Sequence, residues 1–280
     1  MMKTKVSLTK KYSEVATLTI VLTVVFLALH ITSTVLAIKG ILPIGWAIVI
    51  NSIMAYGLFT PMHEAGHLNI SGPKKNLKWI DEVVGWLSGI SLIAPFYIFK
   101  VIHFRHHAHT NDPEKDPDHW LASKNLGALF LHATTIFPVY FYNGFKILFT
   151  EKKLPKKIRK ELIIGFVVAA VYFLAIGIWI ALQSWVYPVL LWVLPAFIAQ
   201  AFLAFAFDWL PHHPHQNKKA YLNTRVVDIP ALSLLLLSQN YHLVHHLHPR
   251  IPFYHYKKAY DEISDKVEEK GVEIIKWSYS

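Results

Sequence analysis

The chain has 280 residues, of which 54% are hydrophobic and only 16% are charged, and it contains 17 histidines but no cysteine. Soluble domains carry about 25% charged residues, so the deficit indicates a protein that lies largely in lipid. The lack of cysteine excludes a disulfide framework, a thiolate zinc finger, a cysteine-ligated iron–sulfur cluster and a cysteine nucleophile from this sequence.

The net charge of +10 does not indicate nucleic-acid binding, because the basic residues lie next to apolar runs. Lys3, Lys5, Lys10 and Lys11 precede the first apolar run, and six more basic residues crowd the segment 151–160 ("EKKLPKKIRK") directly before another. Basic residues in such places follow the positive-inside bias and contact anionic lipids. We therefore expect membrane lipids, and no nucleic acid, among the partners.

Four runs without a charged residue are long enough to cross a bilayer, which needs about 20 apolar residues. They cover approximately residues 16–38, 41–60, 162–182 and 185–207. Very short connections join the first two and the last two, so the spans are expected to form two antiparallel hairpins. The first run is too long for the core of a cleaved signal peptide and is interpreted as a span.

The sidedness of the chain follows from Lys39, the only basic residue that this topology places on the far side. The N-terminus, the central segment and a soluble helical tail at 255–280 should then share the cytoplasmic face. The apolar stretches 86–99 and 125–145 are expected to lie along or dip into the membrane surface, since a crossing by only one of them would move 151–160 outside. The sequence thus predicts an all-α integral membrane protein with a single domain over 1–280.

Three histidine clusters, "HEAGH", "HFRHH" and "HLVHH", are the strongest chemical signal in the sequence. Spacings of three and four residues place side chains on one face of a helix, where imidazoles can converge on an ion. Eight such ligands exceed the need of one ion and indicate two, but imidazole suits Zn, Cu, Fe and Ni alike. The eight are His63, His67, His103, His106, His107, His242, His245 and His246.

The order of these clusters resembles the membrane fatty acid desaturase and hydroxylase superfamily over about residues 40–256. The texts "HHAHTNDPEKDPDHW" (106–120), "DWLPHHPH" (208–215) and "QNYHLVHHLHPRIPFYHY" (239–256) are most similar to cyanobacterial-type β-carotene hydroxylases. Acyl-lipid desaturases carry text similar to the last of these. The resemblance implies a di-iron site held by the eight histidines in a cytosolic, histidine-rich helical cap on four membrane helices.

The resemblance also implies a further histidine ligand between the last span and the final cluster. His212 is preferred over His213 and His215, because it follows Leu-Pro at the end of the fourth span. Asp208 lies four residues earlier on the same helical face and is a candidate for binding iron through a water.

Carboxylates after the second cluster have a physical role near a metal, because a metal-bound histidine usually donates its second ring N–H to a carboxylate, carbonyl or water. Asp112, Asp116 and Asp118 are candidates, with Asp112 and Asp118 preferred. Pro113 and Pro117 restrict the backbone, so a folded loop is expected here.

The reaction implied by the resemblance is the O2-dependent oxidation of an unactivated C–H bond in a lipid-soluble substrate. Hydroxylation of the β-ionone ring of a carotenoid is the first expectation, and desaturation of a fatty acyl chain is the alternative. The sequence has no flavin or nicotinamide fingerprint and no cysteine cluster, so ferredoxin or a reductase is expected to supply electrons. The expected location is the bacterial inner membrane, with the active site on the cytoplasmic face.

Two rival functions use the same residues. "HEAGH" matches H-E-x-x-H, in which Glu64 would be the general base of an intramembrane zinc protease, but this leaves six clustered histidines unexplained. A metal transporter needs polar ligands within its spans, and His30 is the only histidine in the four predicted spans, which contain no charged residue. The sequence therefore supports both of these functions less well than it supports a di-iron oxygenase.

Overall fold

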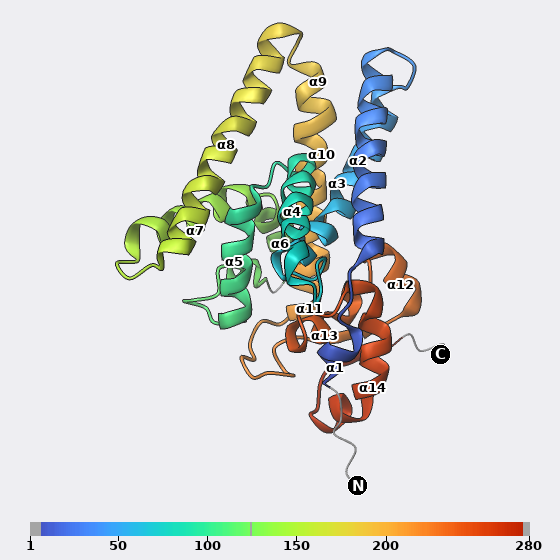
Figure 1. The fold of residues 1–280 in the computed structure, drawn as a ribbon, viewed down its shortest axis with the longest axis vertical. Coiled ribbons are helices and arrows are strands. Elements are labelled where there is room, and N and C mark those ends of the chain that lie inside the picture. Colours follow the sequence, from blue (N-terminus) through green and yellow to red (C-terminus); the bar gives the residue numbers. More distant parts are fainter. Residues whose placement is uncertain (1–6, 124, 277–280) are drawn as a thin grey trace.

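The computed structural model describes residues 7–123 and 125–276 and is mostly helical (Figure 1). Four helical runs are long and apolar enough to cross a membrane: α2 (Thr17–Ile38), α3 (Ile44–Gly66), α8 (Lys156–Leu182) and the run Val186–His212. They match the four predicted spans, but three of them are longer than predicted. An absence of charge marks the part of a helix that lies in lipid, whereas the hydrogen-bonded helix continues into polar sequence. The extensions carry His63 and His212 on the ends of long helices.

Helices α2 and α3 pack closely against each other along their length (Figure 1). A Cβ on Gly57 would lie 2.7 Å from the ring of Phe26, so only glycine permits this approach. Asn51 of α3 contacts Ser33 of α2 and donates to the carbonyl of Leu191 at 2.8 Å. Polar groups satisfied between helices in this way stabilise packing in lipid, and they join three of the four long runs.

The run Val186–His212 is not a regular α-helix. It consists of α9 (Val186–Pro188), α10 (Leu194–Leu203) and α11 (Leu210–His212), separated by the π-helical turns η3 (Val189–Val193) and η4 (Ala204–Trp209). A π-helical turn re-aims the side chains that follow it and is frequent at functional sites. Turn η4 carries Asp208 and directly precedes His212.

The second pair of long runs is arranged differently from the first. Helix α8 meets α9 at the upper end of the molecule and then diverges from α10 (Figure 1). Helix α8 packs instead on α5 (Phe96–His109), where a Cβ on Gly165 would lie 2.7 Å from the side chain of Ile98. The space between the diverging helices is occupied by the central segment of the chain.

That central segment begins with α4 (Lys78–Leu92) and α5, which are bent by 99° at a short break. Ile93 ends α4 in the left-handed conformation, with φ 52°, and Pro95 then begins the next helix. The predicted interfacial stretch 86–99 thus contains this break. The other predicted stretch, 125–145, forms two shorter helices, α6 (Leu126–Ala133) and α7 (Ile136–Thr150).

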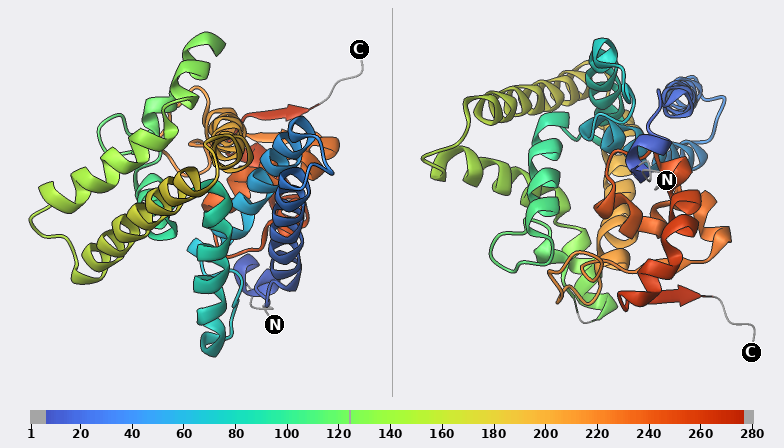
Figure 2. Two further views of the ribbon diagram at one scale, coloured as in Figure 1. Left: turned by 90° about the horizontal axis from the view of Figure 1, so that it is seen from above. Right: turned by 60° about the horizontal axis from the view of Figure 1, so that its bottom comes forward.

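The end of the molecule that bears the chain termini is built from both ends of the sequence (Figure 1; Figure 2, right). Helices α13 (His242–Leu247) and α14 (Tyr256–Glu269) form a core here around Tyr241, Val244 and Tyr256. The predicted helical tail contains α14 but then forms strand β2 (Ile274–Lys276), which pairs in parallel with β1 (Val226–Asp228). The remaining elements are α1 (Leu8–Tyr12), η1 (Lys75–Leu77), η2 (His119–Leu121), α12 (Pro230–Leu235), η5 (Gln239–Tyr241) and η6 (Phe253–His255).

Candidate metal centre

The structure brings the nine predicted histidines together in two groups. In each group the candidate ligand atoms all lie within 4.8 Å of one another. The first group, called here the five-histidine group, contains His63, His67, His103, His107 and His245. The second group, called the four-histidine group, contains His106, His212, His242 and His246. Metal binding by these residues stays a prediction. The distances between their ring nitrogens are the geometric evidence for it.

Helical spacing explains how one cluster serves both groups. On α5, His103 and His107 are four residues apart and face the five-histidine group, while His106 is turned toward the other. On α13, His242 and His246 are again four residues apart and share the four-histidine group, with His245 facing the other way. Two short helical segments therefore supply ligands to both sites.

The distances between ring nitrogens fit ligands that share an ion. Two nitrogens bound at right angles, each about 2.1 Å from one ion, lie about 3 Å apart. In the five-histidine group, Nε2 of His103 lies 2.9 Å from Nε2 of His67 and 3.1 Å from Nε2 of His107. Nε2 of His245 lies 2.8 Å from that of His107 and 3.1 Å from that of His63. The four-histidine group has two such pairs, at 3.1 and 3.2 Å.

The tautomers of the four-histidine group show why a cation fits there. Nδ1 of His106 donates to Oδ1 of Asp116, and Nδ1 of His212 donates to the carbonyl of Asn223, both at 3.0 Å. A neutral imidazole has only one N–H, so Nε2 of each ring carries a lone pair. These two Nε2 atoms face each other at 3.2 Å, which is repulsive unless a proton or a metal ion lies between them. Burial alone would lower the pKa of His106, but the carboxylate of Asp116 raises it to about 10, so this position attracts positive charge. The residues present therefore fit a metal.

Burial favours the protonation state that metal binding needs. Burial lowers the pKa of His242, His245 and His246 well below the ordinary value for histidine. Their imidazoles are consequently neutral at physiological pH, and a neutral imidazole is the form that binds metal. The donor set of both groups is nitrogen only, which suits iron as well as zinc, copper or nickel.

The carboxylate that orients His106 is Asp116. It is buried and also accepts from the backbone N–H groups of Asn111 and Asp118. Asp118, a preferred candidate, lies further away, with Oδ2 3.6 Å from Nδ1 of His106. Asp112 instead pairs with Lys218 at 2.8 Å and accepts from the amides of its own loop, so its role beside a metal-bound histidine stays a prediction. The spacing of the three aspartates gave no means of distinguishing them.

The stretch "DWLPHHPH" contributes differently through each of its polar residues. His212 joins the four-histidine group, whereas His213 and His215 lie outside both groups. Asp208 sits on η4 and faces the cavity described below, with Oδ1 3.6 Å from Nε2 of the buried His215. Its predicted binding through a water stays a prediction.

Glu64 does not have the position of a general base. Its carboxylate accepts from the Thr19 hydroxyl at 2.6 Å and from the backbone N–H of Phe253 at 2.7 Å. The base of an H-E-x-x-H protease must act on a metal-bound water. Both carboxylate oxygens of Glu64 are instead bound to α2 and to the segment after α13. The structure thus gives Glu64 a role in joining elements and removes the support for a zinc protease.

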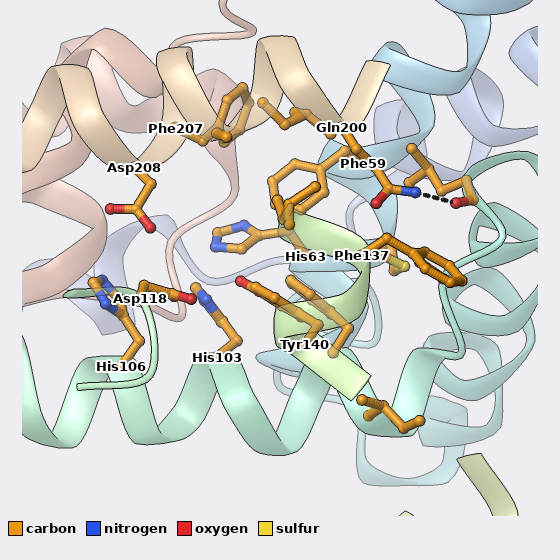
Figure 3. Close-up of a pocket in the computed structure, with 18 of the residues that line it drawn as sticks. Phe59, His63, His103, His106, Asp118, Phe137, Tyr140, Gln200, Phe207 and Asp208 are labelled. Carbon is orange, nitrogen blue, oxygen red and sulfur yellow. Dashed lines mark hydrogen bonds and ion pairs between the residues drawn. The ribbon is translucent and has the colours of Figure 1, made fainter. Parts of the chain in front are cut away.

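An apolar cavity ends at the histidines (Figure 3). Phe59, Phe137 and Phe207 line its walls, and the amide of Gln200 donates to the carbonyl of Leu92 at 2.6 Å. Its inner end is formed by polar residues of both groups and their surroundings: His63, His103, His106, Asp118, Tyr140, Asp208 and His242. Sequence reasoning missed Tyr140, and also Asn223, Gln239 and Tyr256, whose oxygens lie 3.0–3.2 Å from Nδ1 of a clustered histidine.

Comparison with known proteins identifies a family whose model matches this chain. Residues 40–278 match the model of the family described as "Fatty acid desaturase". A "Delta(9) fatty acid conjugase-like enzyme" of Dimorphotheca sinuata is 28% identical over 69% of this chain and 60% of its own length. Two proteins described as "sn-1 oleoyl-lipid 12-desaturase" are each 27% identical. That of Synechocystis sp. aligns over 80% of this chain and 68% of its own length, and that of Picosynechococcus sp. over 74% and 65%. This chain therefore spans about three fifths to two thirds of these relatives.

Proposed function

Because the chain belongs to the fatty acid desaturase family, we propose that it is a membrane-bound di-iron enzyme that introduces a double bond into a fatty acyl chain. The observation that carries this proposal is an apolar cavity whose inner end is lined by histidines of both groups. The relatives named above are desaturases and a conjugase-like enzyme. They favour the acyl alternative over the carotenoid hydroxylation that the sequence motifs had placed first.

The lining of the cavity also supports an acyl substrate. The volume free of protein atoms in the cavity and its mouth is about 870 Å³, and its walls are mainly apolar side chains such as Phe59, Phe137 and Phe207. An acyl chain has no polar group along its hydrocarbon part, so such walls leave none of its atoms unsatisfied.

The cavity walls hold the substrate by close packing. A substrate that enters from the bilayer is already out of water, so van der Waals contacts with the aromatic walls fix the position of the reacting carbons. Fixing a reacting group against its partner removes much of the entropic barrier. The same walls exclude water from the reacting end. Phe99, whose ring stacks on His103 with centroids 5.2 Å apart, closes the wall next to the histidines.

The polar end of the cavity is where protons are needed. Conversion of a –CH2–CH2– unit and O2 into –CH=CH– and two H2O consumes two electrons and two protons. The two irons, when bound, supply the redox chemistry that couples O2 reduction to removal of hydrogen from an unactivated C–H bond. Asp118 and Asp208 lie at this end, and the hydroxyl of Tyr140 lies next to Asp118 (Figure 3). Their oxygens can hold protons beside the histidines.

The orientation and the partners belong to the same proposal. We place the histidine-bearing end on the cytoplasmic face of the bacterial inner membrane, as the distribution of basic residues predicts, with 1–280 as a single domain. The substrate enters from the bilayer, and a separate protein supplies the electrons. The carboxylates, imidazoles and aromatic rings of the site are not themselves electron donors.

Lipid analysis of expressing cells tests this function. Cells that express the chain and receive both oleate and β-carotene should gain an additional double bond in acyl chains, while the carotenoid stays unchanged. His103→Ala should abolish the new fatty acid. His248→Ala is the matched control, because His248 lies outside both groups. Hydroxylated carotenoid with unchanged acyl chains would overturn the proposal.

A further inference from the structure

Each histidine group has one member that is not fully buried. These members are His107 in the five-histidine group and His246 in the four-histidine group. Their rings stack face to face, with centroids 4.3 Å apart and an angle of 22° between the planes. The two groups therefore reach the protein surface at the same place.

The surroundings of these two rings contain exposed apolar side chains and one exposed arginine. Phe104, on the preceding turn of α5, is 43% exposed and places its ring edge-on to His67, with centroids 5.2 Å apart. Ala108 is exposed on the same face of the helix, four residues after Phe104. An exposed aromatic side chain thus contacts a candidate ligand of the five-histidine group directly.

Arg250 supplies the charge. The side-chain amide of Asn69 donates to the carbonyls of Pro249 and Ile251, at 3.0 and 3.2 Å. This fixes the exposed Arg250 beside the segment that follows His67. The docking surface is defined here as Phe104, His107, Ala108, His246 and Arg250.

We propose that an acidic protein carrying a one-electron redox group docks on this surface and passes electrons through His107 and His246. The inference rests on the proposed function, because that reaction consumes two electrons. Stacking of the two rings allows one docked donor to serve both sites. Exposed Phe and Arg side chains are of the types that anchor protein interfaces, and a positive surface on a chain of net charge +10 attracts an acidic partner.

The electron balance follows from one-electron transfer. Each encounter oxidises one reduced donor and delivers one electron, so two encounters supply the two electrons consumed with each O2. The donor leaves in its oxidised form after each transfer. A binding surface for such repeated exchange should be small and dependent on charge, because a rim charge acts mainly on the association rate.

Binding of an acidic plant-type [2Fe–2S] ferredoxin tests the surface. Its Kd would be measured for the full-length protein in detergent, with and without iron, at low and high salt. Arg250→Glu should weaken binding about tenfold at low salt, with little difference at high salt. Ala108→Trp should weaken binding to a similar degree by obstruction, since its Cβ faces solvent. Lys39→Glu is the matched control, because it changes the net charge equally and lies between α2 and α3, at the end of α3 opposite to His63.

A second measurement separates this inference from the proposed function. The rate at which reduced ferredoxin reduces the loaded protein would be compared with the rate for dithionite, a small chemical reductant. Arg250→Glu and Ala108→Trp should slow the first rate and leave the second unchanged. Equal Kd values for Arg250→Glu and Lys39→Glu, or no ferredoxin binding by the unsubstituted chain, would overturn the docking surface. In that case, desaturation driven by a chemical reductant would still support the proposed function. If ferredoxin binds but a chemical reductant drives no desaturation, the proposed function is overturned instead.

Discussion

The two histidine groups are held in place by different means. The five-histidine group draws on the ends of two long elements, α3 and α5, and on one residue of α13. Within residues 7–123 and 125–276, only His245 among its members has an Nδ1 partner, the hydroxyl of Tyr256 at 3.0 Å. The four-histidine group has fewer members, but the Nδ1 atoms of His106, His212 and His242 all have partners. One group has more candidate ligands, and the other has better-oriented rings.

A buried carboxylate serves each group, again in a different way. Glu64 stands between His63 and His67 and bonds to the backbone and side chains of other elements, so it positions a helix. Asp116 bonds directly to a ring of the four-histidine group, so it positions a ligand. The difference indicates that the five-histidine group depends on packing of helices and the four-histidine group on individual hydrogen bonds.

Removal of a ligand from each group should give the largest effect and the clearest contrast. His242→Ala leaves three histidines in its group, and His67→Ala leaves four in the other. We expect iron per chain to fall from about two to about one in His242→Ala and to stay near two in His67→Ala. Elemental analysis of purified protein measures this. Equal loss of iron in the two variants would contradict the idea that the larger group is protected by its additional member.

Removal of the Glu64 carboxylate should reduce stability more than any other change outside the ligands. Glu64→Ala leaves the Thr19 hydroxyl and the Phe253 N–H buried without an acceptor, and each such loss costs about 1–3 kcal/mol. We expect the free energy of unfolding to fall by about 3 kcal/mol, measured by denaturation in detergent. Glu64→Gln keeps an acceptor oxygen and should lose less.

The control for Glu64 is Glu114→Ala, because Glu114 is exposed in the loop after α5. This variant should unfold as the unsubstituted chain does. Stability of Glu64→Ala equal to that of Glu114→Ala would show that the bonds to α2 and to Phe253 do not hold the five-histidine group in place.

Removal of Asp116 should weaken metal binding in the four-histidine group alone. Asp116→Ala frees the Nδ1 of His106, and loss of such a partner costs about 10–100-fold in metal affinity. Asp112→Ala is the matched control, since Asp112 bonds to Lys218 and not to a histidine. Iron titration of the metal-free protein measures both. A larger loss in Asp112→Ala would restore the sequence-based preference for that residue.

Which parts of the structure were predictable depends on the range of the forces involved. The four spans could be predicted from runs without a charged residue, because burying an unpaired charge in lipid is costly whatever the fold. The ends of α3 and of the run Val186–His212 were not predictable from hydropathy, since their last turns are held by contacts with other elements. The break between α4 and α5 follows from Ile93 and Pro95 only in hindsight, because the sequence gives no sign of a left-handed isoleucine.

The candidate site shows the same limit. The residues of the clusters were found by spacing alone, since three- and four-residue intervals place side chains on one helical face. Spacing could not divide His242, His245 and His246 between two groups, because that division depends on how α13 is rotated against α5. It could not choose Asp116 over Asp112 either, since the loop that presents them is held by long-range bonds such as that of Asn111 to the carbonyl of Asn223.

The smallest expected effect concerns the one Nδ1 partner in the five-histidine group. Tyr256→Phe removes the hydroxyl that bonds to His245 but keeps the buried ring. Because four other histidines and the Glu64 contacts hold this group, we expect a loss of only about threefold to tenfold in iron affinity, at or below the lower end of the range for such partners. The measurement is the same iron titration, with Tyr260→Phe as a control in the same core. A loss as large as that of Asp116→Ala would mean that hydrogen bonds to the rings, and not the number of ligands, hold both groups.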